Sequence, residues 1–261
     1  MDYHSFKHAL IVALLLVWGH ISFSQEADST QAISHFSGKI SITHNGISLI
    51  PSFSLDAPAV LFNLSMGGER LTFEPEMRFA LDGKPWSFLF WWRYKAVQSE
   101  RFNLRVGAHP ALNFRTIPVS SNGVERDVIE TRRFLAGELA PSFKVSDNVS
   151  LGAYYLYALG LDESQRHTHF VNVNAAFAPI NLPKNFYLGI FPNAYYLRMD
   201  DLDGFYVSAS LTLANKKCPI SVSAILNKSI QTEIQPERDF VWNVSLVYSF
   251  NKEYIDYSPT L

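Results

Sequence analysis

The sequence predicts an all-β fold in which about 12 antiparallel strands close into a single barrel that crosses a membrane. Apolar and polar side chains alternate with a period of two along nearly the whole chain, as they do on the two faces of a strand. Most alternating segments run for about 10 to 15 residues, enough to cross a bilayer when tilted. The chain is 48% hydrophobic and only 18% charged, although a soluble domain carries about 25% charged residues.

Twelve segments show this alternation. Their approximate spans are 38–50, 57–66, 70–81, 86–97, 102–115, 131–145, 149–161, 167–179, 186–198, 204–215, 219–228 and 239–250. The first span changes parity near Asn45-Gly46, where a bulge or a short turn is expected. Pro75 and Pro192 fall inside spans whose alternation continues on both sides, so each is expected at a bulge.

The two faces of a segment differ in chemistry. From Leu71 to Leu81 one face is apolar, and the other carries Glu74, Glu76 and Arg78. In the next segment Trp86, Phe88, Phe90, Trp92 and Tyr94 share the apolar face, whereas Ser87, Leu89, Trp91, Arg93 and Lys95 share the other. Because a charge facing lipid at the bilayer midplane costs about 2–4 kcal/mol, the uncharged face is predicted to look outward at hydrocarbon.

Residues 1–24 have the pattern of a secretory signal. Lys7 precedes the short apolar stretch Ala9–Trp18, and Ser22 and Ser24 fit a cleavage site before Gln25. An N-terminal membrane anchor is the alternative. After cleavage before Gln25, the mature chain would have an N-terminal periplasmic segment (25–37), the barrel (38–250) and a C-terminal periplasmic tail (251–261).

The connections alternate in length. The even-numbered ones are short and polar, and the odd-numbered ones include the two longest, Thr116–Glu130 and Ser229–Arg238. Membrane barrels have short periplasmic turns and longer outer loops, so both termini are predicted to be periplasmic.

With its leader, its alternating strands, its aromatic strand ends and a last strand that closes on Tyr248-Ser249-Phe250, the chain resembles the outer-membrane β-barrel proteins of Gram-negative bacteria, with a porin-like architecture. The Ser-Gln junction is similar to those of Bacteroidota secretion signals. The resemblance implies an outer-membrane location, with membrane lipid, lipopolysaccharide and the barrel insertion machinery as partners.

Composition excludes several other classes. A formal net charge of −2 gives no basic field for nucleic acid. One cysteine, Cys218, excludes a disulfide framework and a multi-cysteine metal site. The sequence holds no phosphate-binding loop, nucleophile elbow or zinc signature, so no cofactor is expected.

Ionisable residues gather on the predicted inner face of strands three to six, and we expect them to line the lumen. They are Glu74, Glu76, Arg78, Arg93, Lys95, Arg105, His109, Arg115, Arg132, Glu138 and Lys144. They form either a basic track that eases the entry of small anionic solutes or a network of ion pairs that fills a narrow barrel. Glu74 and Glu76 have the spacing of an acid–base pair, but with Arg78 beside them a structural ion pair is favoured.

Two other clusters contain residue types that suit chemistry. His167 and His169 share a face near Asp162, Glu163 and Ser164, which suits a metal site or a hydrolytic set, although an interfacial pair without chemistry is favoured. Asp200, Asp201 and Asp203 lack the spacing of a calcium loop and indicate a polar turn, as does Asn122-Gly123.

The function that these patterns favour is a small passive channel. A lipid- or lipopolysaccharide-modifying enzyme that uses His167 or His169 is one alternative. A structural or surface-binding barrel, with Thr116–Glu130 and Ser229–Arg238 as its recognition loops, is the other.

Overall fold

The computed structural model describes residues 33–121, 124–162 and 165–255. The strands are β1 (Ile33–Thr43), β2 (Ala59–Gly67), β3 (Leu71–Ala80), β4 (Pro85–Gln98), β5 (Phe102–Ser121), β6 (Val124–Ser146), β7 (Val149–Gly160), β8 (His167–Phe177), β9 (Ile180–Asn181), β10 (Phe186–Met199), β11 (Leu202–Asn215), β12 (Ile220–Thr232) and β13 (Phe240–Ile255). Two short 3-10 turns, η1 (Pro51–Phe53) and η2 (Pro183–Asn185), interrupt the connections. No helix in these ranges is long and apolar enough to span a membrane.

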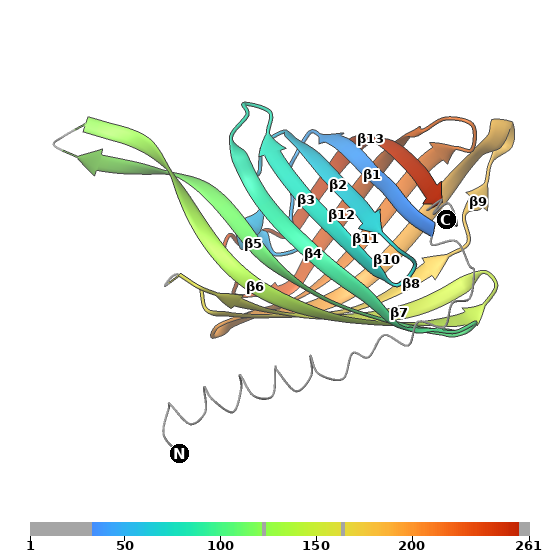
Figure 1. Cartoon of the computed structure of the whole chain (residues 1–261). Helices are drawn as coiled ribbons and strands as arrows, with labels where there is room; N and C mark the ends of the chain where they lie inside the picture. The colour runs from blue at the N-terminus through green and yellow to red at the C-terminus, as the bar shows by residue number, and fades with distance from the viewer. Residues whose placement is uncertain (1–32, 122–123, 163–164, 256–261) are drawn as a thin grey trace, which may run out of the picture. The chain divides into compact units, whose positions relative to one another are not determined.

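The sheet closes on itself. β1 pairs with β13 from Ile33↔Ile255 to Thr43↔Ser245, and every other neighbouring pair is also antiparallel. The two-residue β9 only flanks β10, which pairs directly with both β8 and β11. The described residues therefore form a closed barrel of twelve strands (Figure 1), which confirms the predicted fold class. Closure leaves no unpaired edge exposed to lipid.

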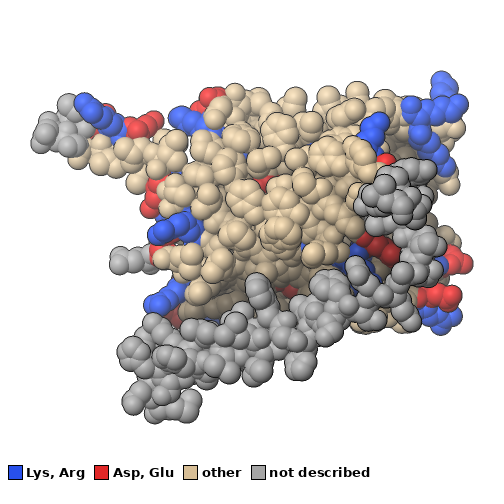
Figure 2. Space-filling model, in the orientation of Figure 1, with Lys and Arg blue, Asp and Glu red and all other residues tan. Residues whose placement is uncertain are grey.

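The apolar face looks outward, as predicted. Trp92 is 53% exposed on the outer surface, whereas its neighbour Trp91 is 3% exposed inside the barrel. Phe73 packs on Trp92 with ring centroids 4.7 Å apart, and Phe88 packs on Phe114 at 5.1 Å. In Figure 2 the face between the two ends of the barrel is mostly free of charged side chains, and the Lys, Arg, Asp and Glu atoms gather toward the ends.

One tryptophan breaks the alternation. The β3–β4 register shifts between Arg78↔Ser87 and Phe79↔Pro85, so Trp86 is the extra residue of a bulge. Trp86 is 2% exposed and turns inward, where its ring lies 5.3 Å from the Arg78 guanidinium. Its predicted place on the outer face was therefore wrong, because a bulge flips the face of one residue.

The expected bulges at Pro75 and Pro192 are absent. Pro75 pairs with Phe90 of β4, while its β2 side skips two pairs without changing register. Pro192 pairs with Ala209 of β11, and the β8 pairing begins one residue later. Each proline lacks a backbone N–H, and one of its two neighbouring strands makes no pair with it. The missing donor therefore costs no hydrogen bond, and no bulge is needed.

Three connections differ from their predicted form. β1 ends at Thr43, so residues 44–50, the end of the first predicted span (38–50), belong to a loop of residues 44–58 and not to a strand. The predicted loop Thr116–Glu130 is instead a hairpin that extends β5 and β6 far beyond the barrel rim (Figure 1). β12 continues to Thr232, so the last long connection shrinks to residues 233–239.

The barrel boundaries are wider than predicted, since Ile33–Ser37 belong to β1 and Asn251–Ile255 to β13. The signal sequence, its cleavage site and the rest of the tail lie outside the described residues.

Candidate functional site: the barrel lumen

The loop formed by residues 44–58, here named the inner loop, folds into the barrel. Three wall strands donate hydrogen bonds to its backbone carbonyls. Trp86 Nε1 donates to the Phe53 carbonyl at 2.7 Å, and Tyr195 Oη donates to the Leu49 carbonyl at 3.0 Å. Arg115 Nη2 donates to the Ser52 carbonyl at 2.9 Å. An ion pair between Asp56 and Arg238 also ties the loop to the β12–β13 connection.

The inner loop packs against an apolar cluster on one side of the lumen. The cluster is formed by Phe170, Tyr195, Leu197, Met199, Tyr206 and Ile234. Leu49 and Ile50 of the loop pack directly on it. Burial of this apolar surface favours the inward position of the loop, because each large side chain removed from water contributes about 1.5–3 kcal/mol.

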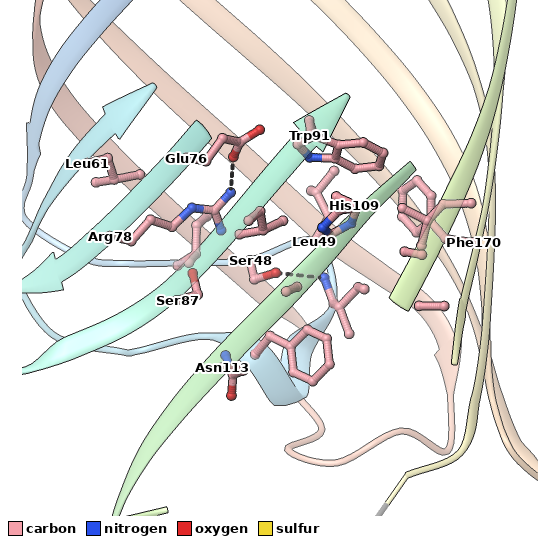
Figure 3. A pocket seen from close by; sticks show the side chains of 18 of the residues that line it. Ser48, Leu49, Leu61, Glu76, Arg78, Ser87, Trp91, His109, Asn113 and Phe170 are labelled. Carbon is pink, nitrogen blue, oxygen red and sulfur yellow. Dashed lines mark hydrogen bonds and ion pairs between the residues drawn. The ribbon is translucent and has the colours of Figure 1, made fainter. Parts of the chain in front are cut away.

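A cavity of about 470 Å³ remains between the inner loop and the wall strands, here named the inner cavity (Figure 3). Its lining is mostly aliphatic and aromatic, from Ile47, Leu49, Ile50 and Phe53 of the loop and Leu61, Leu89, Trp91, Phe134, Leu156, Phe170 and Ile225 of the wall. Small residues on three adjacent strands, Ala111, Ala136 and Ala158, leave the space open. Glu76 and Arg78 lie together at one side of it.

A charged cluster lies next to the inner cavity. The fully buried Glu138 carboxylate accepts hydrogen bonds from Arg93 Nε at 2.9 Å, Arg105 Nε at 3.0 Å and Tyr154 Oη at 2.9 Å. Arg93 also pairs with Glu74. Two arginines thus face two carboxylates, and we name Glu74, Arg93, Arg105, Glu138 and Tyr154 the central cluster.

Gly107 makes the central cluster possible. Arg93 of β4 and Glu138 of β6 both lie opposite Gly107 of β5 in the strand register. A Cβ at this position would lie 3.0 Å from Glu138 Cγ and 3.1 Å from Arg93 Cγ. The absence of a side chain lets the two partners meet across the middle strand.

A second cavity, of about 460 Å³, lies on the other side of Tyr154, toward the end of the barrel that carries the short turns. We name it the turn-side cavity; Lys95, Arg105, Gly152, Asn174 and Phe191 are among its lining residues. Because Tyr154 lines both cavities, the central cluster stands between them.

The predicted inner-face residues mostly occur in pairs. Arg78 pairs with Glu76 at 2.7 Å and Arg132 with Glu130 at 2.8 Å, while Lys144 pairs with Asp147 at the β6–β7 turn. His109 is buried and packs on Trp91 with ring centroids 3.8 Å apart and the rings tilted by 38°. Lys95 makes no ion pair among the described residues. The role of these residues in solute passage stays a prediction.

Sequence reasoning placed Tyr154 and Gly107 on the inner face but missed their roles in the central cluster, and it missed the inner loop and Tyr195. The parity change at Asn45-Gly46 was the available signal for the loop, since it marked the place where the strand ends. Tyr154 lies on a face with Gly152 and Leu156, and nothing in that local pattern indicates a carboxylate partner on another strand.

The histidine pair lies on the outer face. His167 Nδ1 is 2.8 Å from Tyr157 Oη, and His169 Nδ1 is 2.9 Å from Tyr155 Oη. Nearby, the Arg133 side chain and backbone N–H hold the pKa of Asp162 below its usual range, while Glu163 and Ser164 lie outside the described residues. In the described part of the chain, no three His, Cys, Asp or Glu residues are grouped to hold a metal ion.

The sequence matches no known protein-family model and no curated protein. Among solved structures, the KdgM porin aligns with a TM-score of 0.50 at 11% identity, over 83% of this chain and 99% of that one. The NanC porin aligns with a TM-score of 0.45 at 12% identity, over 85% and 100%. A loop-deletion form of OmpT, an outer-membrane protein of Vibrio cholerae, gives a TM-score of 0.42 at 6% identity, over 84% and 99%.

The chain has the fold of a porin-like outer-membrane β-barrel. This conclusion rests on the closed antiparallel sheet and its apolar exterior, with the KdgM alignment in support.

Proposed function

We propose that this barrel is a small passive channel of the Gram-negative outer membrane. The observation that carries the proposal is the unfilled lumen, in which the inner and turn-side cavities stand on opposite sides of the central cluster. A purely structural barrel of small diameter is filled by its side chains. Here the narrow points are the central cluster and the inner loop.

The proposal includes an orientation. The periplasmic end is the one that carries the short turns, the start of β1 and the end of β13. The opposite end, which carries the β5–β6 hairpin and from which the inner loop folds in, faces the cell exterior. The outer surface contacts membrane lipid and lipopolysaccharide, and the chain reaches its membrane through the barrel insertion machinery.

Selectivity in this proposal comes from fixed charge. The two arginines of the central cluster are balanced by Glu74 and Glu138, so the cluster contributes little net field. Lys95, at the turn-side cavity, carries a positive charge that would favour small anionic solutes. The KdgM porin has been solved in complex with disordered oligogalacturonate, and this ligand belongs to KdgM.

Single-channel recording in planar bilayers tests the proposal. The purified barrel should give discrete openings, and Lys95→Glu should shift the reversal potential toward cation preference, while Lys144→Glu at the turn surface should shift it much less. Folded protein that inserts and never conducts would overturn the channel assignment. A wild-type reversal potential that Lys95→Glu leaves unchanged would overturn the role given to Lys95.

The enzyme alternative gains no support from these contacts, because both imidazole rings of His167 and His169 pack against tyrosines on the outer face.

A further inference from the structure

The lining of the inner cavity does not suit a sugar or a simple ion. Polar solutes need hydrogen-bond partners to replace lost water, and an unpaired polar group in an apolar site costs about 1–3 kcal/mol. Apolar side chains line the cavity on three sides. Leu49 and Phe53 line it from the loop, Leu89 and Trp91 from β4, and Leu156 from β7.

Polar side chains also line the cavity, but several are already engaged within the protein: Arg93 and Tyr154 bind Glu138, and Asn243 binds backbone groups. Arg78 and Glu76 form one ion pair on β3, and Asn113 faces the same region from β5 (Figure 3). Ser87, on β4 beside Arg78, is also at the wall of the cavity. The cavity therefore has an apolar wall that reaches Phe134 and Phe170, and a row of polar side chains, Arg78, Ser87 and Asn113, that crosses three adjacent strands.

The volume is that of a ligand site. Small-molecule pockets occupy about 300–1,000 Å³ and are lined by apolar side chains with a few polar groups that fix orientation. The inner cavity, at about 470 Å³, falls in this range. Ala111, Ala136 and Ala158 keep it open where larger residues would fill the barrel.

From this lining we infer that the inner cavity binds a small amphipathic molecule, with its apolar body along the Leu89, Trp91 and Phe134 wall and its one polar group beside Arg78 and Asn113. The inference names the solute class of the proposed channel and rests on that proposal for the route into the barrel.

Tryptophan quenching in lipid nanodiscs tests the inference. Trp92 and Trp242 face lipid, so they are changed to Phe together with Trp18, which leaves Trp86 and Trp91 inside the barrel. The probe is 12-bromododecanoic acid, whose bromine quenches a tryptophan on contact. Quenching of the inner tryptophans should saturate at one acid per barrel.

Two matched variants locate the site. Ala136→Phe fills the inner cavity, and Ala140→Phe makes the same change on the same face of β6 but beside the turn-side cavity. The first should weaken binding by at least about tenfold, and the second should change it by less than about twofold. Phe134→Ala, which enlarges the cavity, covers the case in which Ala136→Phe does not fold, and it should allow a longer bromoacid to bind.

A short acid supplies the control for the head group. 3-Bromopropanoic acid has the same carboxylate without the chain and should give no saturable quenching. Equal quenching by the short acid, or quenching by the long acid that Ala136→Phe leaves unchanged, would overturn the inference.

Conductance of the same preparations separates the two proposals. A barrel that conducts but does not bind the long acid keeps the channel and loses the amphipathic site. A barrel that binds the acid but never conducts keeps the site and loses the channel.

Discussion

At the scale of single residues, Glu138 decides the electrostatics of the lumen. Its carboxylate has no exposed surface and accepts hydrogen bonds from Arg93, Arg105 and Tyr154. A buried carboxylate with three donors is stable only while its partners remain, because removal of one member leaves uncompensated charge behind. Gly107 has no side chain to contribute to the cluster, but this absence leaves the space in which Arg93 and Glu138 contact each other.

The first prediction concerns this carboxylate. Glu138→Gln leaves Arg93 and Arg105 short of a counter-charge and should lower the free energy of unfolding by about 3 kcal/mol, measured by urea titration in phospholipid vesicles. Asp147→Asn removes an exposed partner of Lys144 at a turn and should leave the titration unchanged. Equal effects of the two changes would contradict the account of the central cluster.

At the scale of elements, the sequence predicted the strands well and the loops poorly. Alternation predicts strands because it records which face meets lipid, and this holds for the segments around Leu71–Ala80 and Phe240–Phe250. It fails for residues 44–50, whose apolar side chains belong to the loop inside the barrel and not to a strand. It also misplaces Trp86, because the local pattern does not reveal a bulge.

The candidate site was predictable in part. Period two predicts a charged inner face of β3 to β6, and Glu76, Arg78, Arg93 and His109 of that set line the inner cavity. The role of the set as pore-lining residues stays a prediction. Their pairing does not follow, because it depends on which strands lie opposite each other and on Gly107. The contribution of Tyr154 and Tyr195 depends on contacts between distant parts of the chain, which local spacing does not record.

The second prediction concerns the inner loop. Replacing residues 46–56 by a short Gly-Ser turn removes the segment held by Trp86, Tyr195 and Arg115, and single-channel conductance should rise at least about twofold because the lumen widens. The recording is made beside the wild-type barrel under the same salt. Conductance equal to that of the wild type would show that the loop does not narrow the path.

The third prediction concerns the β5–β6 hairpin. Its outer part has no partner strand beyond the hairpin itself among the described residues, so its removal costs the barrel no lateral pairing. Deleting residues 117–128 and joining the strands with a tight turn should leave the thermal unfolding midpoint within about 3 °C of the wild type, measured by circular dichroism. A larger loss of stability would show that the hairpin supports the barrel.

At the scale of the whole molecule, the structure combines an apolar exterior with an interior that is partly charged and partly apolar. Closure of β1 on β13 satisfies the backbone in lipid without any external partner. The central cluster separates the enclosed space into two cavities, so the lumen is not one uniform bore. The functional proposals rest on the division between the apolar outer face of the barrel wall and its enclosed inner face.

Adjacent tryptophans test that division most directly. One variant keeps only Trp91 and the other keeps only Trp92, with the remaining tryptophans changed to Phe, and both are reconstituted with brominated phospholipid. Since Trp92 is 53% exposed on the outer face and Trp91 is 3% exposed inside, the lipid should quench Trp92 strongly and Trp91 little. Stronger quenching of Trp91, or equal quenching of the two, would contradict the orientation of the barrel wall.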